Sequence, residues 1–304
     1  MVTKLVMFTG CLAVLAVAGS LVGAAETTYS WEEELPFVTM GSAKVNGSYI
    51  SCNGIMLSDH HMLTTANCIP QTKDFEMKHY LVMSSDCITG DTTAIAAKKF
   101  IVHPDYKADS RTNNIAIVVL EEEMQDLEED EIPIIMQTNP EAKDKLFMAG
   151  WENDGTGMAG TSAFVGYSLF SNNAEHTSCT DKVIAKVDGF KESRYMCVSL
   201  DASQKTSKAI SASGLFGTRN GTAALYGLLS TTVEADNIKT PVLVRVAPYL
   251  PWIQKSTNLT LKALTGGDDE LHDFAADSAA EILALAPSML ALTTAGVLAA
   301  WAAL

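Results

Sequence analysis

The chain has 304 residues, of which 47% are hydrophobic, and a formal net charge of −15 at pH 7. This length allows one large domain or two small ones, with enough apolar side chains for a core. The acidic balance argues against a nucleic-acid-binding protein, which would present a basic surface. Part of the negative charge lies in one run, Glu121–Glu131. We interpret this run as a solvated loop or helix face rather than a dedicated site for basic ligands.

Residues 1–24 are expected to be a secretory signal peptide. Lys4 precedes an apolar run from Leu5 to Val22, and a small-x-small pattern at Val22 and Ala24 provides a cleavage site near Ala24 or Ala25. A membrane anchor is the competing interpretation, but the small residues favour cleavage.

Cysteines and sequons agree with a secretory route. After the signal peptide, five cysteines allow two disulfides and one remaining thiol, and three Asn-x-Ser/Thr sequons allow N-glycans. The cysteines are Cys52, Cys68, Cys87, Cys179 and Cys197, and the sequon asparagines are Asn46, Asn220 and Asn258.

Residues 28–258 predict a mostly β domain. Apolar or alternating runs of strand length are separated by Gly, Asn, Asp and Ser, and one helical pattern at residues 244–257 follows them. Many short strands suggest a sandwich or a barrel, and the pattern alone does not choose between them. The runs lie at 49–58, 60–68, 98–103, 113–120, 145–151 and 225–233.

The C-terminal part of the chain differs in composition. Residues 259–281 are small, polar and acidic, which we interpret as a linker or stalk, and residues 282–304 carry no charge. That tail is long enough to span a bilayer. Small residues at Gly266–Asp268 and Asp277–Ala279 precede it. With the signal peptide, this arrangement suggests a GPI-attachment signal, and a plain transmembrane span is the alternative.

Eight motifs, in order along the chain, resemble the chymotrypsin/trypsin family of serine proteases. The most telling is LTTANC, which is similar to the family's LTAAHC. The resemblance implies an all-β fold of two six-stranded antiparallel barrels, a cleft between them and a short C-terminal helix. It also implies the disulfides Cys52–Cys68 and Cys179–Cys197, which leaves Cys87 over. The motifs include LTTANC (63–68), FIVHPDY (100–106), NNIAIVVL (113–120), MAGWENDGTG (148–157), ISASGLF (210–216) and LYGLLS (225–230).

The resemblance also implies a degenerate catalytic triad. Asn67 stands in place of the histidine base, Asn114 in place of the aspartate, and Ser213 in the slot of the nucleophile. An amide is not a base near neutral pH. Without a base, the hydroxyl of Ser213 is an ordinary one, and a small polar loop residue is the simpler interpretation of it.

The oxyanion region departs from the family as well. Ala212 replaces the aspartate that pairs with a new N-terminus after activation cleavage. Ser211 and Leu215 stand where the family has glycines, and Gly214 alone persists. On the strand that binds substrate in the family, Ser230 is followed by two threonines instead of Trp-Gly.

No other residue is expected to replace the missing chemistry. The six histidines lie outside the catalytic slots, and we expect surface or packing roles for them. The chain has no His-Glu-x-x-His and no Cys-x-x-Cys, so no metal site is expected, and it has no nucleotide fingerprint, so no cofactor is expected. The histidines are His60, His61, His79, His103, His176 and His272.

Three hypotheses about function follow. The favoured one is a secreted or surface-anchored serine protease homologue without activity that binds a protein, for example an extracellular hydrolase. The glucanase inhibitor proteins of plant-pathogenic water moulds have this profile. The alternatives are a residual serine hydrolase that uses Ser213 with another base, and a structural surface glycoprotein without a specific partner.

Overall fold

A computed structural model describes residues 35–72, 75–83, 94–125, 127–141, 144–151, 167–200, 211–219 and 222–267. The expected signal peptide and hydrophobic tail, Cys87 and Asn220 lie outside these ranges. Within them, none of the helices is long and apolar enough to cross a membrane.

The N-terminal half of the domain is a closed barrel of six antiparallel strands in the order β1-β2-β3-β6-β5-β4. Its first hairpin turns at Asn46 and Gly47, whose φ angles are 49° and 86°. Asn-Gly suits the two left-handed positions of a tight hairpin turn. The strands are β1 (Val38–Val45), β2 (Ser48–Ser58), β3 (His61–Thr64), β4 (Tyr80–Met83), β5 (Ile95–Val102) and β6 (Ala116–Leu120).

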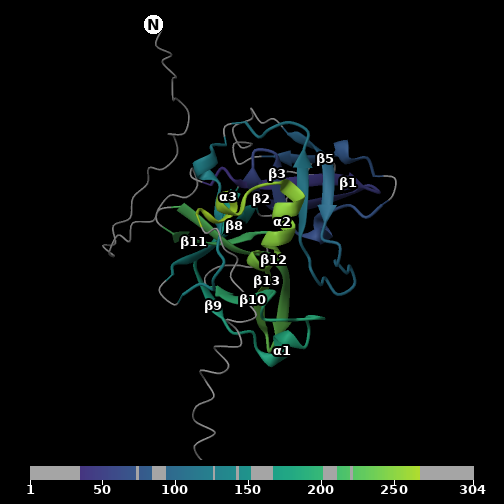
Figure 1. Ribbon diagram of the computed structural model, residues 1–304. Helices are drawn as coiled ribbons and strands as arrows, with labels where there is room; N and C mark the ends of the chain where they lie inside the picture. Colours follow the sequence, from purple (N-terminus) through teal and green to yellow (C-terminus); the bar gives the residue numbers. More distant parts are fainter. Residues whose placement is uncertain are drawn as a thin grey trace, which may run out of the picture. The chain divides into compact units, whose positions relative to one another are not determined.

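The C-terminal half is a second ring of six antiparallel strands, β11-β8-β9-β10-β13-β12, which the β11–β12 pairing closes. A seventh short strand, β7, adds to β12 in parallel. The two-barrel fold that the resemblance implied is therefore confirmed (Figure 1). The strands are β7 (Ile134–Ile135), β8 (Leu146–Trp151), β9 (Tyr167–Thr177), β10 (Tyr195–Leu200), β11 (Gly214–Arg219), β12 (Thr222–Ala235) and β13 (Ile238–Arg245).

Both barrels contribute to one hydrophobic core. Phe216 of β11 packs between two rings, with centroid distances of 5.4 Å to Phe37 and 5.5 Å to Phe147. Phe37 precedes β1, so this aromatic group joins the two halves of the domain. Burial of such large side chains supplies much of the stabilisation of a core.

The expected C-terminal helix is present but begins later than the pattern predicted. Val244 and Arg245 belong to β13, and a 3₁₀ turn, η7 (Ala247–Tyr249), separates that strand from the helix α2 (Leu250–Thr257). Val244 is fully buried and pairs with β10 and β12, so sheet pairing overrides the helical pattern at its start. Within the described ranges, one further α-helix, α1 (Asp181–Ile184), precedes it.

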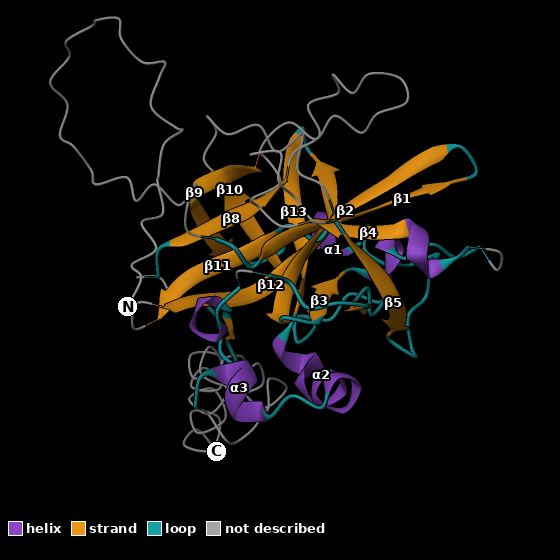
Figure 2. Ribbon diagram, turned by 90° about the horizontal axis from the view of Figure 1, so that it is seen from above, coloured by secondary structure: helices purple, strands orange, loops and turns teal. Residues whose placement is uncertain are grey.

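The folded domain extends beyond residue 258, where its end was expected. Helix α3 (Leu261–Thr265) follows α2 directly, and the two lie next to each other in Figure 2. Leu264 is 3% exposed, and a Cβ added to Gly266 would lie 2.8 Å from Ile134 of β7. The first residues of the expected linker are therefore packed against the second barrel.

Candidate functional site

Four polar side chains from distant parts of the chain are joined by a series of hydrogen bonds. Asn114, which precedes β6, donates through Nδ2 to Oδ1 of Asn67 at 2.7 Å. Asn67 lies on the 3₁₀ turn η2 (Ala66–Cys68) and donates through Nδ2 to Oγ of Ser211 at 3.4 Å. Ser230 of β12 accepts a further bond from Nδ2 of Asn114 at 2.9 Å. These four residues are named the amide network below.

Asn113 holds the buried end of the amide network in place. Its φ is 53°, a left-handed conformation that asparagine tolerates better than most residues. Its Nδ2 donates to the carbonyl of Asp105 at 2.9 Å, and its Oδ1 accepts from Tyr249 at 3.0 Å and from Arg194 at 2.5 Å. Asn114, the next residue, is fully buried, so its position is set by the fold rather than by solvent.

Ser211, and not Ser213, is the serine beside Asn67. Ser213 is fully buried, and its Oγ accepts from Nδ2 of Asn53 at 3.0 Å. A Cβ added to Gly150 of β8 would lie 2.8 Å from that Oγ, which shows how closely Ser213 packs against β8. The expectation that Ser213 fills the nucleophile slot is thus corrected. ISASGLF contains two serines two positions apart, and the motif alone could not tell which of them faces Asn67.

The residues assigned to the oxyanion region lie in different surroundings. Ala212 is fully buried against the Cys52–Cys68 disulfide, and its φ of 67° is a left-handed conformation that costs a non-glycine residue about 1–2 kcal/mol. Gly214 pairs with Leu228 in β12, and Leu215 is buried in a separate cluster of the second barrel. Residues 201–210, which precede Ser211, lie outside the described ranges.

The main chain at Ser230 is already bonded. The β12–β13 ladder is irregular between Leu229 and Thr231, and the carbonyl of Ser230 accepts from Nη1 of Arg111 at 3.0 Å. Arg111 has a φ of 54°, and its own carbonyl accepts from the hydroxyl of Tyr195 at 3.3 Å. The resemblance assigns this part of β12 to the substrate-binding strand. A peptide that paired there would share this carbonyl oxygen with Arg111, since a carbonyl oxygen can accept two hydrogen bonds.

The amide network consists of amide and hydroxyl groups, which do not titrate near neutral pH. It offers neither an imidazole nor a carboxylate, which are the groups that take up protons in catalysis or bind most metals. Its chemistry is therefore hydrogen bonding.

Three of the described histidines, His61, His103 and His176, are partly buried. The ring of His103 lies 5.2 Å from those of Tyr249 and Trp252, and burial lowers its pKa below the ordinary 6.5. Burial is also the main cause of the lowered pKa of His61 and of His176, with the neighbouring His60 and Arg245, respectively, adding to it. The packing contacts of His103 agree with the role expected for it.

The two predicted disulfides are present. Cys52 and Cys68 join with an S–S distance of 2.07 Å, and Cys179 and Cys197 with 2.05 Å. The first lies beside η2 and so fixes the segment that carries Asn67. Of the sequon asparagines, Asn46 and Asn258 are exposed and have left-handed φ angles of 49° and 61°.

The chain belongs to the trypsin family, whose family model, "Trypsin", matches residues 30–253. It is similar to mast cell protease 3 of Ovis aries, with 21% identity over 244 residues that span 79% of this chain and 90% of the relative.

Solved structures show the same fold at low identity. The scabies mite inactivated protease paralogue S-I1 has a TM-score of 0.57 and 15% identity, with 75% of this chain and 96% of that one covered. Neuropsin, a serine protease expressed in the limbic system of mouse brain, has a TM-score of 0.52 and 20% identity, with 74% and 95% covered.

Proposed function

We propose that this protein is a trypsin-family member without protease activity that works by binding another protein. The observation that carries the proposal is the amide network, in which Asn67 stands beside Ser211. A serine hydroxyl becomes a nucleophile when a neighbouring base takes its proton. The amide of Asn67 has no such basicity, so Ser211 keeps its proton.

Two further observations support the loss of activity. Ala212 packs against the Cys52–Cys68 disulfide in a left-handed conformation, and Arg111 donates a hydrogen bond to the carbonyl of Ser230. Ala212 and Ser230 lie in segments that the family uses to bind the oxyanion and the substrate, respectively. The scabies mite protein of similar fold is named an inactivated protease paralogue. It is consistent with a two-barrel fold that persists after protease activity is lost.

The partner that we favour is an extracellular hydrolase. A domain held by disulfides and carrying exposed sequons suits an oxidising extracellular setting. We further propose that residues 1–24 direct secretion and that residues 282–304 are exchanged for a GPI anchor. The acidic residues between the domain and this tail would then hold the domain away from the membrane.

Labelling with a fluorophosphonate, together with a peptide-ester assay, tests the loss of activity. Active trypsin is the positive control, and Ser211→Ala and Ser213→Ala are the matched variants. We expect neither labelling nor turnover above background. Stoichiometric labelling that Ser211→Ala abolishes would establish a residual serine hydrolase and overturn the proposal.

Binding and anchoring need separate measurements. Immobilised protein should retain an extracellular hydrolase saturably and lower the activity of that hydrolase. Failure across the secreted hydrolases of the native milieu would instead favour a structural glycoprotein. For the anchor, phosphatidylinositol-specific phospholipase should release the protein from cells. A protein that resists release and retains Trp301 would be a transmembrane one.

A further inference from the structure

A second group of polar side chains lies apart from the amide network, at the turn between β2 and β3. Asp59 and His60 form the turn, and Glu123 follows β6. One potential ligand atom from each of these three residues lies within 4.8 Å of the others. We propose that this turn cluster, Asp59, His60 and Glu123, binds a divalent cation of the zinc type.

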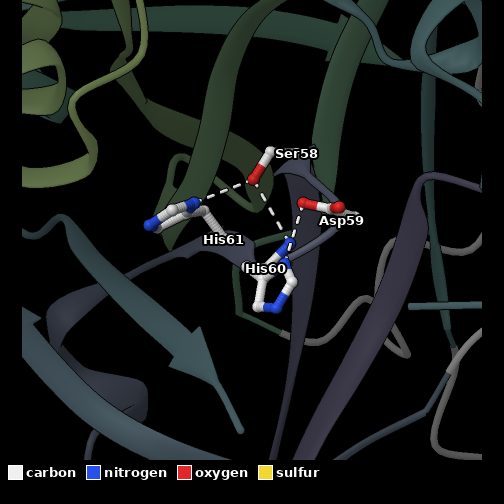
Figure 3. A network of polar contacts seen from close by, with 4 residues as sticks. All are labelled: Ser58, Asp59, His60 and His61. Carbon is white, nitrogen blue, oxygen red and sulfur yellow. Dashed lines mark hydrogen bonds and ion pairs between the residues drawn. The ribbon is translucent and has the colours of Figure 1, made fainter. Parts of the chain in front are cut away.

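The side chains at the turn are close to one another and open to solvent. Oδ1 of Asp59 lies 3.0 Å from Nδ1 of His60, as Figure 3 shows. Their side chains are 49% and 40% exposed, respectively, so an ion could enter from solvent and keep water as a further ligand. His61 lies on the other side of Ser58, with its Nδ1 2.8 Å from Oγ of Ser58, and is not part of the cluster.

Main-chain hydrogen bonds hold the segment that carries the third ligand, Glu123, next to the turn. The N–H of Leu120 donates to the carbonyl of His60 at 2.9 Å, and the N–H of Met124 donates to the carbonyl of Asp59 at 2.8 Å. Leu120 and Met124 are both buried, so the segment that carries Glu123 is packed on each side of it. A site whose ligands are already positioned by the scaffold loses less entropy when it binds.

The donor set selects the kind of cation. One imidazole nitrogen and two carboxylate oxygens suit Zn²⁺, which accepts nitrogen and oxygen ligands in a four-coordinate shell that water can complete. Ca²⁺ prefers six to eight oxygens, which three side chains including an imidazole do not supply. The exposed residues Glu121 and Glu122 precede Glu123 in the sequence, and together with the net charge of −15 they raise the local concentration of cations.

This interpretation gives the acidic run Glu121–Glu131 a role at its first residues. It also adds a metal site where sequence motifs predicted none, because the ligands come from two segments that are more than sixty positions apart. Pairing of β3 with β6 is what brings them together.

Calorimetric titration of the purified full chain with ZnCl₂ tests the site, with CaCl₂ as the comparison ion. We expect saturable zinc binding, weakened about tenfold or more by His60→Ala and by Glu123→Gln. His79→Ala, which removes an exposed imidazole on another turn, should bind as the wild type does. Circular dichroism of each variant confirms that it is folded. The Co²⁺-loaded protein should show a visible absorption band that His60→Ala removes.

Two results would overturn the proposal: the absence of saturable zinc binding, or affinities and cobalt spectra of His60→Ala and Glu123→Gln that match the wild type. Neither result bears on the lack of protease activity, because the cluster shares no residue with the amide network.

Discussion

Asn67 and Asn114 are joined by two hydrogen bonds in opposite directions. Nδ2 of Asn114 donates to Oδ1 of Asn67 at 2.7 Å, and the main-chain N–H of Asn67 donates to Oδ1 of Asn114 at 2.9 Å. Asn114 is fully buried, and a neutral amide can both donate and accept there without the cost of a buried charge. The pair therefore ties η2 to the start of β6 and stabilises the first barrel.

The first prediction concerns this pair. Asn114→Asp replaces a donor with a carboxylate oxygen that would face Oδ1 of Asn67. We expect the free energy of unfolding at pH 7 to fall by about 3 kcal/mol, since the substitution buries a charge that faces another acceptor instead of a partner. Urea denaturation measures the change, and Asn46→Asp, in an exposed turn, is the control. A fall in the free energy of unfolding of less than half the expected value would show that the segment around Asn114 can rearrange.

The second prediction concerns restoration of the triad. Asn67→His combined with Asn114→Asp supplies a base and a carboxylate beside Ser211. We expect turnover of a peptide ester to remain at background, because Ala212 and Arg111 still shape the substrate segments and catalytic residues act as a unit. Turnover that Ser211→Ala then removes would show that the substitutions at Asn67 and Asn114 are the sole defect.

The third prediction separates the two serines. Ser213→Ala removes a fully buried hydroxyl that accepts from Asn53, so we expect a loss of about 1–2 kcal/mol of unfolding free energy. Ser211→Ala removes a half-buried hydroxyl whose bond to Asn67 is long, at 3.4 Å, and should cost clearly less. Urea midpoints of the two variants give the comparison. The reverse order would place Ser213, and not Ser211, at the accessible end of the network.

The fourth prediction concerns acid stability. Burial lowers the pKa of His103 below the 6.5 of a free imidazole. The folded state thus favours the neutral ring, and its contribution is present above pH 6.5 and is lost as the pH falls through the folded pKa. We expect the free energy of unfolding to decline from pH 7 to pH 5, and His103→Gln to flatten this decline. An NMR titration that places the pKa of His103 above 6.5 would contradict the sign.

Much of the architecture follows from short-range signals in the sequence. Cys52 and Cys68 are separated by the interval of the family's disulfide, and the structure joins them. The sequence Asn46-Gly47 indicates a hairpin turn, because few other residue pairs adopt two successive left-handed conformations. The position of Asn67 could be assigned from LTTANC, since the adjacent strand and disulfide leave it little freedom.

Tertiary structure decided which side chains meet. The left-handed turn at Ala212 directs Ser211 towards Asn67 and Ser213 towards Asn53, and no periodicity reports such a turn. Arg111 reaches Ser230 across 119 positions of the sequence, and Glu123 reaches Asp59 through the pairing of β3 with β6. Local sequence determines a turn such as that at Asn46 and Gly47, where the residue types themselves favour the left-handed conformation. Contacts between distant segments depend on how the barrels close and pack, which only the folded chain determines.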